Sequence, residues 1–427
     1  MRTQNHGSIR SALIIALCSA LAACGGGGSG GGSGAAPQHT EYHGIAVADL
    51  DGDGTNDIVA ARVFDDGVNP LQSAIDVFRG DPASAGRFLP RVSYPITAQP
   101  YAITVADMNL DGHPDVIVSC TFAETGFRLL LQQAAGGGVL LPGSFTATPD
   151  HVYRTAVADV DLDGLPDVVA GMNTELALVT QQTAAPGTFN AAVTIGRGSR
   201  QVIATDLNAD GLIDVAAPRD IPNASNAVIY YLQDAAMPGT FEPSRSISAS
   251  DSNFSAAHDV ASGLLDAQPG IDLAVAGVRV EEIGTSRDVY AVWSRLLQTA
   301  ANSGTFAHGG RYQLGFAYET LIAVGDLNAD GRDDVAVAAR TRTSKNHNFV
   351  AVSLQNASGT FPQTSGRFLN IPAELVGTAP ALYTVAIADL NGDGRPDIVV
   401  SNNAILYFPQ RSDAAGEFGP AVAIAYQ

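Results

Sequence analysis

Short apolar runs recur along the chain in pairs, and each pair flanks an acidic stretch. The runs are rich in Val, Ile and Ala and are bounded by Asp and Gly, which is typical of short buried β-strands. The runs before an acidic stretch are GIAVA, AITVA, RTAVA, QVIAT, LIAVG and TVAIA, and those after it are DIVAA, DVIVS, DVVAG, DVAAP, DVAVA and DIVVS. The pattern therefore predicts one strand before and one strand after each stretch.

A third apolar run and a glycine turn follow most of these pairs. The third runs are IDVF, RLLLQ, LALVTQ, VIYYLQ, VAVSLQ and ILYF. The turns are GSF at 143–145, GTF at 187–189, 239–241, 304–306 and 359–361, and GEF at 416–418. A fourth extended piece after each turn completes a unit of about 50 to 60 residues, which is the size of a four-stranded propeller blade.

The six acidic stretches share one spacing. Counted from its first aspartate, each has Asp at positions 1, 5 and 9, Asp or Asn at position 3, and Gly at position 6. Alternate side chains of a chain that curls around an ion point towards it, and Ca²⁺ takes six to eight oxygen ligands, so the spacing indicates calcium loops. Glycine at position 6 allows the positive φ that a tight loop needs.

The predicted ligands follow from this register. The side-chain ligands are Asp49, Asp51, Asp53 and Asp57; Asp107, Asn109, Asp111 and Asp115; Asp159, Asp161, Asp163 and Asp167; Asp206, Asn208, Asp210 and Asp214; Asp326, Asn328, Asp330 and Asp334; and Asp389, Asn391, Asp393 and Asp397. Position 7 is expected to add a backbone carbonyl, from Thr55, His113, Leu165, Leu212, Arg332 and Arg395.

Two other calcium motifs do not match these stretches. An EF-hand loop requires a bidentate Glu at position 12. Position 12 is instead occupied by Ala60, Val118, Ala170, Ala217, Val337 and Val400. Nine-residue β-helix repeats are excluded as well, because the stretches start some 47 to 63 residues apart, with one double gap.

The double gap contains a seventh unit without the ion spacing. Residues 257–277 end in the strand IDLAVAG, and a third run and GTF turn follow. Its two aspartates, Asp259 and Asp272, are thirteen residues apart instead of eight. We therefore expect seven units and about six structural Ca²⁺ ions.

The chain resembles a known family in these features. The D-x-[DN]-x-D-G-x-x-D loop between two apolar strands, followed by a Gly-x-Phe turn, resembles the FG-GAP or VCBS repeat of integrin-α-like β-propellers over about residues 40–427. The resemblance implies an all-β, seven-bladed β-propeller with calcium loops between the first and second strands of six blades. Such repeats occur in adhesion proteins, lectin-like modules and some polysaccharide lyases, so the activity stays open.

The first residues indicate export. Arg2 and Arg10 precede the apolar run ALIIALCSALAA, and Leu21-Ala22-Ala23-Cys24 resembles a bacterial lipobox. The resemblance implies a signal peptide over 1–23, an acylated Cys24 and a Gly/Ser-rich tether over 24–39. Gly25, in place of Asp, implies sorting to the outer membrane. The alternative is an ordinary secretory signal, with the protein released.

Charge and cysteine content narrow the class of protein. The 43 acidic residues exceed the 23 basic ones, and twenty of the acids stand in the six loops. An acidic surface is unsuited to nucleic acid, which requires a basic stripe. Cys120 alone remains in the predicted folded part, so we expect a buried, unreactive thiol and no disulfide within the protein. We also expect the protein to be a monomer.

The leading functional hypothesis is a surface-anchored binding or adhesion module for glycan or protein ligands. The aromatic side chains that offer stacking surfaces for sugars are Tyr42, Tyr101, Tyr153, Tyr230, Tyr231, Trp293, Tyr312, Tyr318 and Tyr383. One alternative is a polysaccharide lyase for acidic glycans, with the basic loop 340–348 supplying Arg340, Arg342, Lys345 and His347, or with His43, His151 and His258 near inner-strand starts. Another is an envelope scaffold or assembly factor.

Overall fold

The computed structural model describes residues 39–65, 71–121, 124–133, 137–219, 226–248, 254–283, 286–341, 348–362, 367–376 and 381–424, all within the unit Pro37–Gln427. The predicted signal peptide, Cys24 and the tether up to residue 38 lie outside these residues. So do Arg342, Lys345 and His347 of the basic loop.

The described strands form seven four-stranded antiparallel sheets, called blades 1 to 7 here in chain order. Blade 1 consists of β1 (His39–Ala48), β2 (Asp57–Asp65), β3 (Gln72–Phe78) and β4 (Val92–Ile96). Blade 2 consists of β5 (Gln99–Ala106), β6 (Asp115–Thr121), β7 (Gly126–Leu130) and β8 (Ser144–Ala147). Blade 3 consists of β9 (Arg154–Ala158), β10 (Asp167–Gly171), β11 (Glu175–Val179) and β12 (Val193–Arg197).

The remaining blades follow the same order. Blade 4 consists of β13 (Ile203–Thr205), β14 (Asp214–Pro218), β15 (Asn226–Tyr231) and β16 (Arg245–Ser248). Blade 5 consists of β17 (Ala256–Gly263), β18 (Asp272–Ile283), β19 (Ser286–Gln298) and β20 (Phe306–Phe316). Blade 6 consists of β21 (Glu319–Gly325), β22 (Asp334–Arg340), β23 (Phe349–Ser353) and β24 (Arg367–Asn370), and the short helix α1 (Ala373–Val376) follows it. Blade 7 consists of β25 (Thr384–Ala388), β26 (Asp397–Ser401), β27 (Ile405–Phe408) and β28 (Val422–Ala423).

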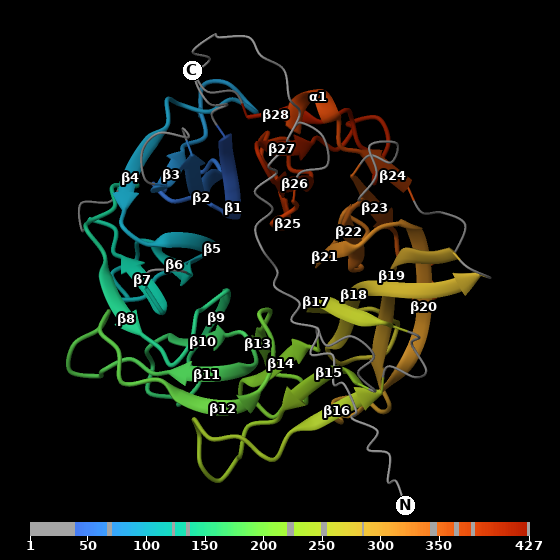
Figure 1. Ribbon diagram of the computed structural model, residues 1–427, viewed down its shortest axis with the longest axis horizontal. Helices are drawn as coiled ribbons and strands as arrows, with labels where there is room; N and C mark the ends of the chain where they lie inside the picture. Colours follow the sequence, from blue (N-terminus) through green and yellow to red (C-terminus); the bar gives the residue numbers. More distant parts are fainter. Residues whose placement is uncertain are drawn as a thin grey trace, which may run out of the picture. The chain divides into compact units, whose positions relative to one another are not determined.

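The blades are arranged around a central axis. First strands of neighbouring blades contact one another from β1 and β5 round to β25 and β1. Figure 1 shows these seven strands nearest the centre and the fourth strands at the outside. The unit is therefore a seven-bladed β-propeller, which confirms the predicted all-β, seven-bladed fold.

Second strands are buried along their length because each lies inside its own sheet and between two neighbouring blades. In β10, for example, Val168, Val169 and Ala170 are fully buried. Position in the blade thus explains why the runs after the acidic stretches are continuously apolar, while outer strands such as β12 are largely exposed.

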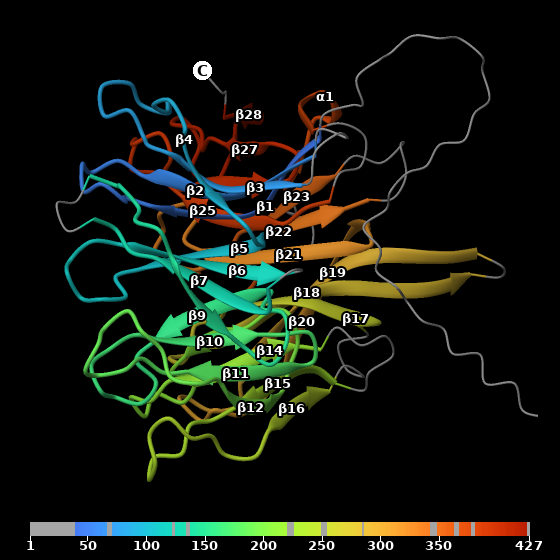
Figure 2. The ribbon, with the colours of Figure 1, turned by 60° about the vertical axis from the view of Figure 1, so that its left-hand side comes forward.

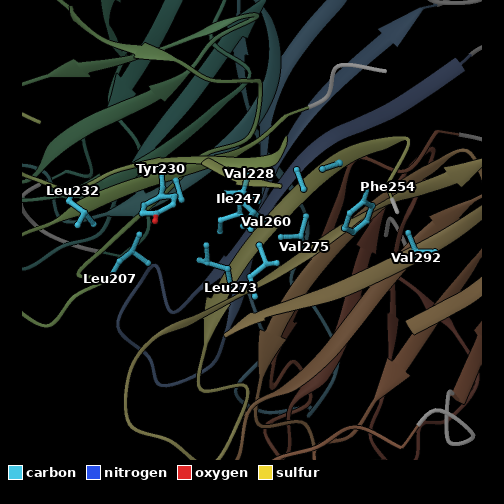
Figure 3. Packing of buried hydrophobic residues seen from close by; sticks show 14 residues of the cluster. Leu207, Val228, Tyr230, Leu232, Ile247, Phe254, Val260, Leu273, Val275 and Val292 are labelled. Carbon is cyan, nitrogen blue, oxygen red and sulfur yellow. The ribbon is translucent and has the colours of Figure 1, made fainter. Parts of the chain in front are cut away.

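Adjacent blades pack through their apolar faces. Between blades 4 and 5, Tyr230 and Val228 of β15 belong to the same core cluster as Val260 of β17 and Val275 of β18 (Figure 3). Burial of these side chains is the main driving force for stacking one blade on the next.

The ring closes without exchange of a strand between the first and last blades. Described strands of blades 1 and 7 come from consecutive segments at opposite ends of the chain. The Tyr42 amide donates to the Asn402 carbonyl at 2.7 Å, and the Tyr383 hydroxyl donates to the Glu41 carboxylate at 3.0 Å. Backbone and side-chain hydrogen bonds therefore join the two ends of the propeller.

A glutamine at the end of the third strand links each of several blades to the blade before it. Its side-chain amide donates to a backbone carbonyl in the preceding blade's loop between the first and second strands. The pairs are Gln132 with Leu50, Gln181 with Met108, Gln298 with Leu207, Gln355 with Leu264, and Gln410 with Leu327. This glutamine recurs in the sequence, although only the structure reveals its partner.

Blade 1 has Gly80 at the glutamine position. A Cβ at residue 80 would lie 2.7 Å from Thr55 Oγ1 and 2.9 Å from the Asn56 carbonyl oxygen, so a side chain does not fit. Asn56 instead donates to the Asp389 carbonyl of blade 7 at 2.8 Å. The junction that closes the ring thus uses a different residue for the same kind of bond.

The predicted turn of blade 2 is wrong. The turn of blade 2 is formed by Gly138 and Leu140, whereas GSF at 143–145 is not the turn: Phe145 lies in β8 and is 39% exposed. Gly138 has a φ of 68° and donates to Gln132, and Leu140 occupies the place of the usual Phe. The sequence motif Gly-x-Phe did not detect this turn because Leu140 stands in place of Phe.

Blade 5 differs from the other blades in length. Strands β18, β19 and β20 run for 12, 13 and 11 residues, and Figure 2 shows β18 and β19 extending past the strands of the neighbouring blades.

The described residues contain no helix with the length and hydrophobicity of a membrane span.

Replacement of Gln181 by Ala is expected to destabilise the propeller by about 2 kcal/mol. The change leaves the Met108 carbonyl and the Gly187 amide, both bonded to Gln181, without their partner in a buried place. Urea unfolding in millimolar calcium measures the free energy. Exposed Gln182→Ala is the matched control, and an equal effect of the two substitutions would contradict the inter-blade role.

Candidate functional site

The six acidic stretches form loops between the first and second strands of blades 1, 2, 3, 4, 6 and 7, as predicted. Their backbone has positive φ at position 6, where glycine was expected, and also at position 4. Position 4 is occupied by Gly52, Leu110, Leu162, Ala209, Ala329 and Gly392, with φ between 57° and 76°. Four non-glycine residues thus adopt a left-handed conformation that is unfavourable for them, so the rest of the loop imposes this shape.

Carboxylates at positions 1 and 5 bind the loop's own amides. In the first loop, Asp49 accepts the N–H of Gly54 at 2.9 Å, and Asp53 accepts the N–H of Thr55 at 2.8 Å. The equivalent bonds from positions 6 and 7 occur in every one of the six loops. These bonds direct the acidic side chains towards the inside of the loop.

The two loops with four aspartates bring carboxylates together. Asp49, Asp51 and Asp53 each have an oxygen within 4.8 Å of the others, and so do Asp159, Asp161 and Asp167. Burial and the neighbouring carboxylate of Asp163 raise the pKa of Asp161. Like charges are therefore held close enough to repel one another.

Two carboxylate oxygens in these loops are buried without a donor. Among the described residues, Asp51 Oδ1 and Asp159 Oδ1 accept no hydrogen bond. An unsatisfied buried oxygen is unfavourable, and a bound cation would satisfy it. The donor set is all oxygen, which suits a hard cation such as Ca²⁺, so the residues fit the expected ion.

The other four loops have Asn at position 3. The side-chain oxygen of Asn109, Asn208, Asn328 or Asn391 accepts the position 5 amide at 3.0 to 3.2 Å. In blades 6 and 7 the position 7 side chains, Arg332 and Arg395, also reach the position 5 carboxylates, Asp330 and Asp393. These two loops thus contain a cation of their own beside the acidic cluster.

Position 9 has a structural role that sequence reasoning missed. Its aspartate is fully buried, and its two oxygens accept the backbone N–H of position 2 and the N–H at the end of the third strand, at 2.7 to 3.0 Å. Burial raises the pKa of Asp57, Asp167, Asp214 and Asp397 to about 6, and of Asp334 to about 7, against the opposing effect of these donors. Each oxygen keeps a second lone pair, which is available to an ion.

Blade 5 keeps the acidic residues at positions 3 and 9, Asp266 and Asp272, and loses the ion spacing at positions 1, 5 and 6. Asp272 accepts the amides of Leu265 at 3.2 Å and Gln298 at 2.9 Å. Position 1 is therefore Leu264, eight residues earlier, whereas Asp259 lies inside β17. The thirteen-residue pair was thus the wrong register, while the predicted loss of ion ligands agrees with the residues at positions 1, 5 and 6, which are Leu264, Gln268 and Pro269.

A second set of side chains lies at the opposite ends of the inner strands. Six residues before position 1, each blade has one residue that lies in the first half of its first strand or up to three residues before it. These seven residues, called the mouth ring here, are His43, Tyr101, Tyr153, Arg200, His258, Thr320 and Tyr383. At about 3.3 Å per residue, the mouth ring stands roughly 20 Å from the acidic loops.

Neighbouring members of the mouth ring contact one another across blade boundaries. The His43 ring lies 4.4 Å from that of Tyr383 and 6.0 Å from that of Tyr101, centroid to centroid. Tyr101 meets Tyr153 edge to face at 5.0 Å, and the Arg200 guanidinium lies 4.5 Å over the Tyr153 ring. These contacts run without a break from blade 7 to blade 4.

β-Bulges place three members of the mouth ring. Pairing between the first and second strands shifts at His43, at Tyr101 and at His258. A bulge leaves one residue outside the ladder and redirects its side chain. Gly44, next to the bulge, allows β5 of blade 2 to approach closely, because a Cβ there would lie 2.6 Å from the Ala102 Cα.

Charged groups surround the mouth ring. Glu41 accepts from His43 Nε2 at 2.8 Å, and Arg154 donates to the Tyr383 carbonyl at 2.6 Å, which joins blade 3 to blade 7. Burial and then Glu41 raise the pKa of Tyr383, so its hydroxyl stays protonated. Burial also raises the pKa of Asp259, to about 6.

The other predicted candidates divide between core and surface. Tyr42, Tyr230, Tyr231, Trp293 and Tyr312 are buried in blade packing and offer no open stacking face. His151 and Tyr318 lie just before first strands, and Arg340 pairs with Glu319 at 3.1 Å. Burial raises the pKa of the Cys120 thiol to about 12, which agrees with the predicted unreactive, buried cysteine.

Comparison with known families supports the repeat assignment. The profile of the FG-GAP-like repeat matches residues 49–118 and 326–400. Each match begins at position 1 of one acidic loop and ends in the strand after the next loop. The chain carries FG-GAP-like repeats. Each matched segment thus covers the last three strands of one blade and continues through the first strand and into the second strand of the next blade.

Several solved structures are similar to this chain at low sequence identity. A lectin of Agrocybe aegerita, described as recognising non-reducing terminal N-acetylglucosamine, is 17% identical, with 92% of this chain and 91% of that chain covered and a TM-score of 0.50. The rhamnogalacturonan lyase YesW is 14% identical (88% and 73% covered, TM-score 0.43), and a rhamnogalacturonan lyase of Bacillus licheniformis is 13% identical (88% and 71%, TM-score 0.40). No curated protein matches the chain. The likeness to the lectin concerns the fold alone.

Replacement of Asp272 by Asn is expected to be more costly at pH 5 than at pH 7.5, by about 1 kcal/mol. Burial raises the pKa of Asp272 to about 6, above the ordinary value of 3.8. The native state therefore binds this proton more tightly than the unfolded chain does, and wild-type stability from this carboxyl is lost as pH rises from 4 to 6. Urea unfolding at both pH values, in calcium, measures the difference.

The control for this prediction lies in the same loop. Asp266→Asn removes one negative charge but keeps an oxygen acceptor for the Gln268 amide. A penalty for Asp272→Asn that is equal at both pH values, or larger at pH 7.5, would contradict the assignment.

Proposed function

We propose that this protein is a calcium-dependent binding module, anchored in the bacterial cell envelope by a lipid on Cys24, whose ligand is a glycan or a protein. One arrangement carries the proposal. The inner strands of a rigid propeller have acidic loops at one end and aromatic and ionisable side chains at the other. The fold thus separates a place for ions from a place for a ligand.

The acidic loops support calcium by their chemistry. Oxygen donors at positions 1, 3, 5 and 9 point into loops whose shape recurs six times, and two buried carboxylate oxygens have no donor in the described part of the protein. Bound Ca²⁺ supplies the positive charge that offsets repulsion among these carboxylates. Six ions would contribute twelve positive charges against a net charge of −20.

Calcium in this arrangement has a structural role. Extracellular calcium modules bind with Kd values on the order of 10⁻⁴ to 10⁻³ M. At tenfold excess over Kd, each site stabilises the native state by about 1.4 kcal/mol, so six sites give about 8 kcal/mol. This is comparable to the whole stability of an ordinary domain. Calcium in the acidic loops would stabilise the propeller, and the ligand would bind at the opposite ends of the inner strands.

A binding module is favoured over the other classes by what the described residues offer. The mouth ring presents stacking faces and hydrogen-bonding groups together. The basic loop on which the lyase hypothesis depends lies outside the described residues, apart from Arg340, Thr341 and Asn348. No contact in the described part of the chain favours the lyase or the assembly factor, so both stay alternatives.

Chelation of calcium is expected to lower the melting temperature of the full chain by more than 10 °C, and calorimetric titration is expected to show about six bound ions. The reason is that carboxylates within 4.8 Å of each other repel without a cation. Magnesium is a control, because it prefers a smaller octahedral site. A melting temperature that chelator leaves unchanged would contradict the calcium proposal.

Cys24→Ser is expected to move the protein from the membrane fraction to the soluble fraction of the host cells, and to abolish labelling by a radioactive fatty acid. The reason is that only a thiol at this position accepts the lipid. Cys120→Ser is the matched control, since its thiol is buried. A membrane-bound, labelled Cys24→Ser protein would rule out this anchor.

A further inference from the structure

We propose that the mouth ring is a binding site for a neutral sugar, a pyranose residue without a carboxylate. This inference depends on the proposed function and names its ligand class. The seven positions hold three of the twelve tyrosines and two of the eight histidines of the chain, although the inner strands are otherwise built from small apolar residues. Such a concentration at one register is not needed for blade packing.

The mouth ring is open to solvent in part. Tyr101, Tyr153, Arg200, His258 and Tyr383 are half-buried, so each keeps some exposed surface. The tyrosines that serve blade packing, such as Tyr42, are instead fully buried. Side chains that are packed on one side and exposed on the other provide fixed faces on which a sugar ring can lie.

Hydrogen-bonding groups of both kinds stand beside the aromatic faces. The guanidinium groups of Arg154 and Arg200 donate, and the carboxylates of Glu41, Asp259 and Glu319 accept. A sugar hydroxyl both donates and accepts, and therefore suits a site that offers both. Arg340 pairs with Glu319, so three carboxylates are balanced by three guanidinium groups. No net positive charge is left to attract an anionic sugar, and the charge balance therefore favours a neutral one.

The mouth ring is held in shape before any ligand binds. Glu41 accepts both His43 Nε2 and the Tyr383 hydroxyl, while His43 Nδ1 lies 3.1 Å from the Pro100 carbonyl. Arg154 crosses from blade 3 to the Tyr383 carbonyl. These bonds fix side chains from several blades, and a preformed site loses little entropy on binding.

One donor near the mouth ring lacks a partner. Among the described residues, Arg154 Nε is buried and makes no hydrogen bond. A buried guanidinium N–H without an acceptor is unfavourable, and a ligand hydroxyl beside Arg154 would satisfy it. This orphan donor is independent of the aromatic contacts and points to the same site.

The test uses the full chain in millimolar calcium. Neutral gluco-, manno-, galacto- and N-acetylhexosamine oligosaccharides are compared with uronic-acid oligosaccharides by microarray and then by calorimetry. The expected result is binding of at least one neutral sugar, with affinity at least tenfold weaker in Tyr153→Ala and in Arg200→Ala. Tyr153→Phe keeps the stacking face and is expected to bind within threefold of wild type.

Controls separate binding from folding. Phe316→Ala removes an exposed aromatic from β20, outside the mouth ring, and is expected to leave affinity unchanged. Each variant is compared by its melting temperature in calcium. If Tyr153→Ala is unstable, Arg200→Ala still tests the site, because it leaves the Tyr153 side chain in place.

Each outcome discriminates. Neutral-sugar binding that the mouth-ring variants leave intact would overturn the site and keep the proposed function. Binding of uronic-acid oligosaccharides alone would overturn the ligand class. No sugar binding by wild type would overturn the whole inference, whereas the proposed function would then be judged by capture of protein ligands and by the chelation experiment.

Discussion

Every blade depends on one buried carboxylate that accepts two backbone N–H groups. Asp57 and its counterparts join the start of the loop after the first strand to the end of the third strand. Buried amides that no strand ladder can satisfy need an acceptor, and a carboxylate with two oxygens supplies two. Blade 5 shows that this constraint belongs to the fold, because Asp272 makes both bonds although Leu264 stands where an ion ligand would.

The loops build on this fixed point. With position 9 tied to the blade, positions 1 and 5 bind the loop's own amides, and position 4 is held in a left-handed conformation even where it is Leu or Ala. The same geometry brings like charges together. The contacts that give the loop its shape therefore also bring its carboxylates together, which is the basis for the proposed cation. The glutamine beside position 9 extends the constraint to the preceding blade.

The inner strand has a different role at each of its ends. Its last residues lead into the acidic loop, and its first residues contribute to the mouth ring, where the blades meet through His43, Tyr101, Tyr153 and their neighbours. A separation of roughly 20 Å would allow the proposed ions to stabilise the ring of blades without occupying the proposed ligand site. The first strands of three blades have a β-bulge at the residue that belongs to the mouth ring, at His43, Tyr101 and His258.

The sequence by itself determined the number of blades, the location of the six loops and the residues that line them, because apolar runs and ligand spacing are local patterns. The sequence pattern predicted the wrong turn in blade 2, because Leu140 stands in place of the usual Phe. It also predicted the wrong register for the loop of blade 5, because the pattern placed its first position at Asp259 instead of Leu264. The sequence also suggested His43, Tyr101, Tyr153, His258 and Tyr383 as candidates. It did not reveal that each of them lies six residues before position 1 of its loop. Only the tertiary structure decided which residues meet across blades. Those contacts join residues up to 342 positions apart, such as Glu41 and Tyr383, and depend on ring closure and on bulges, which no short spacing in the chain encodes.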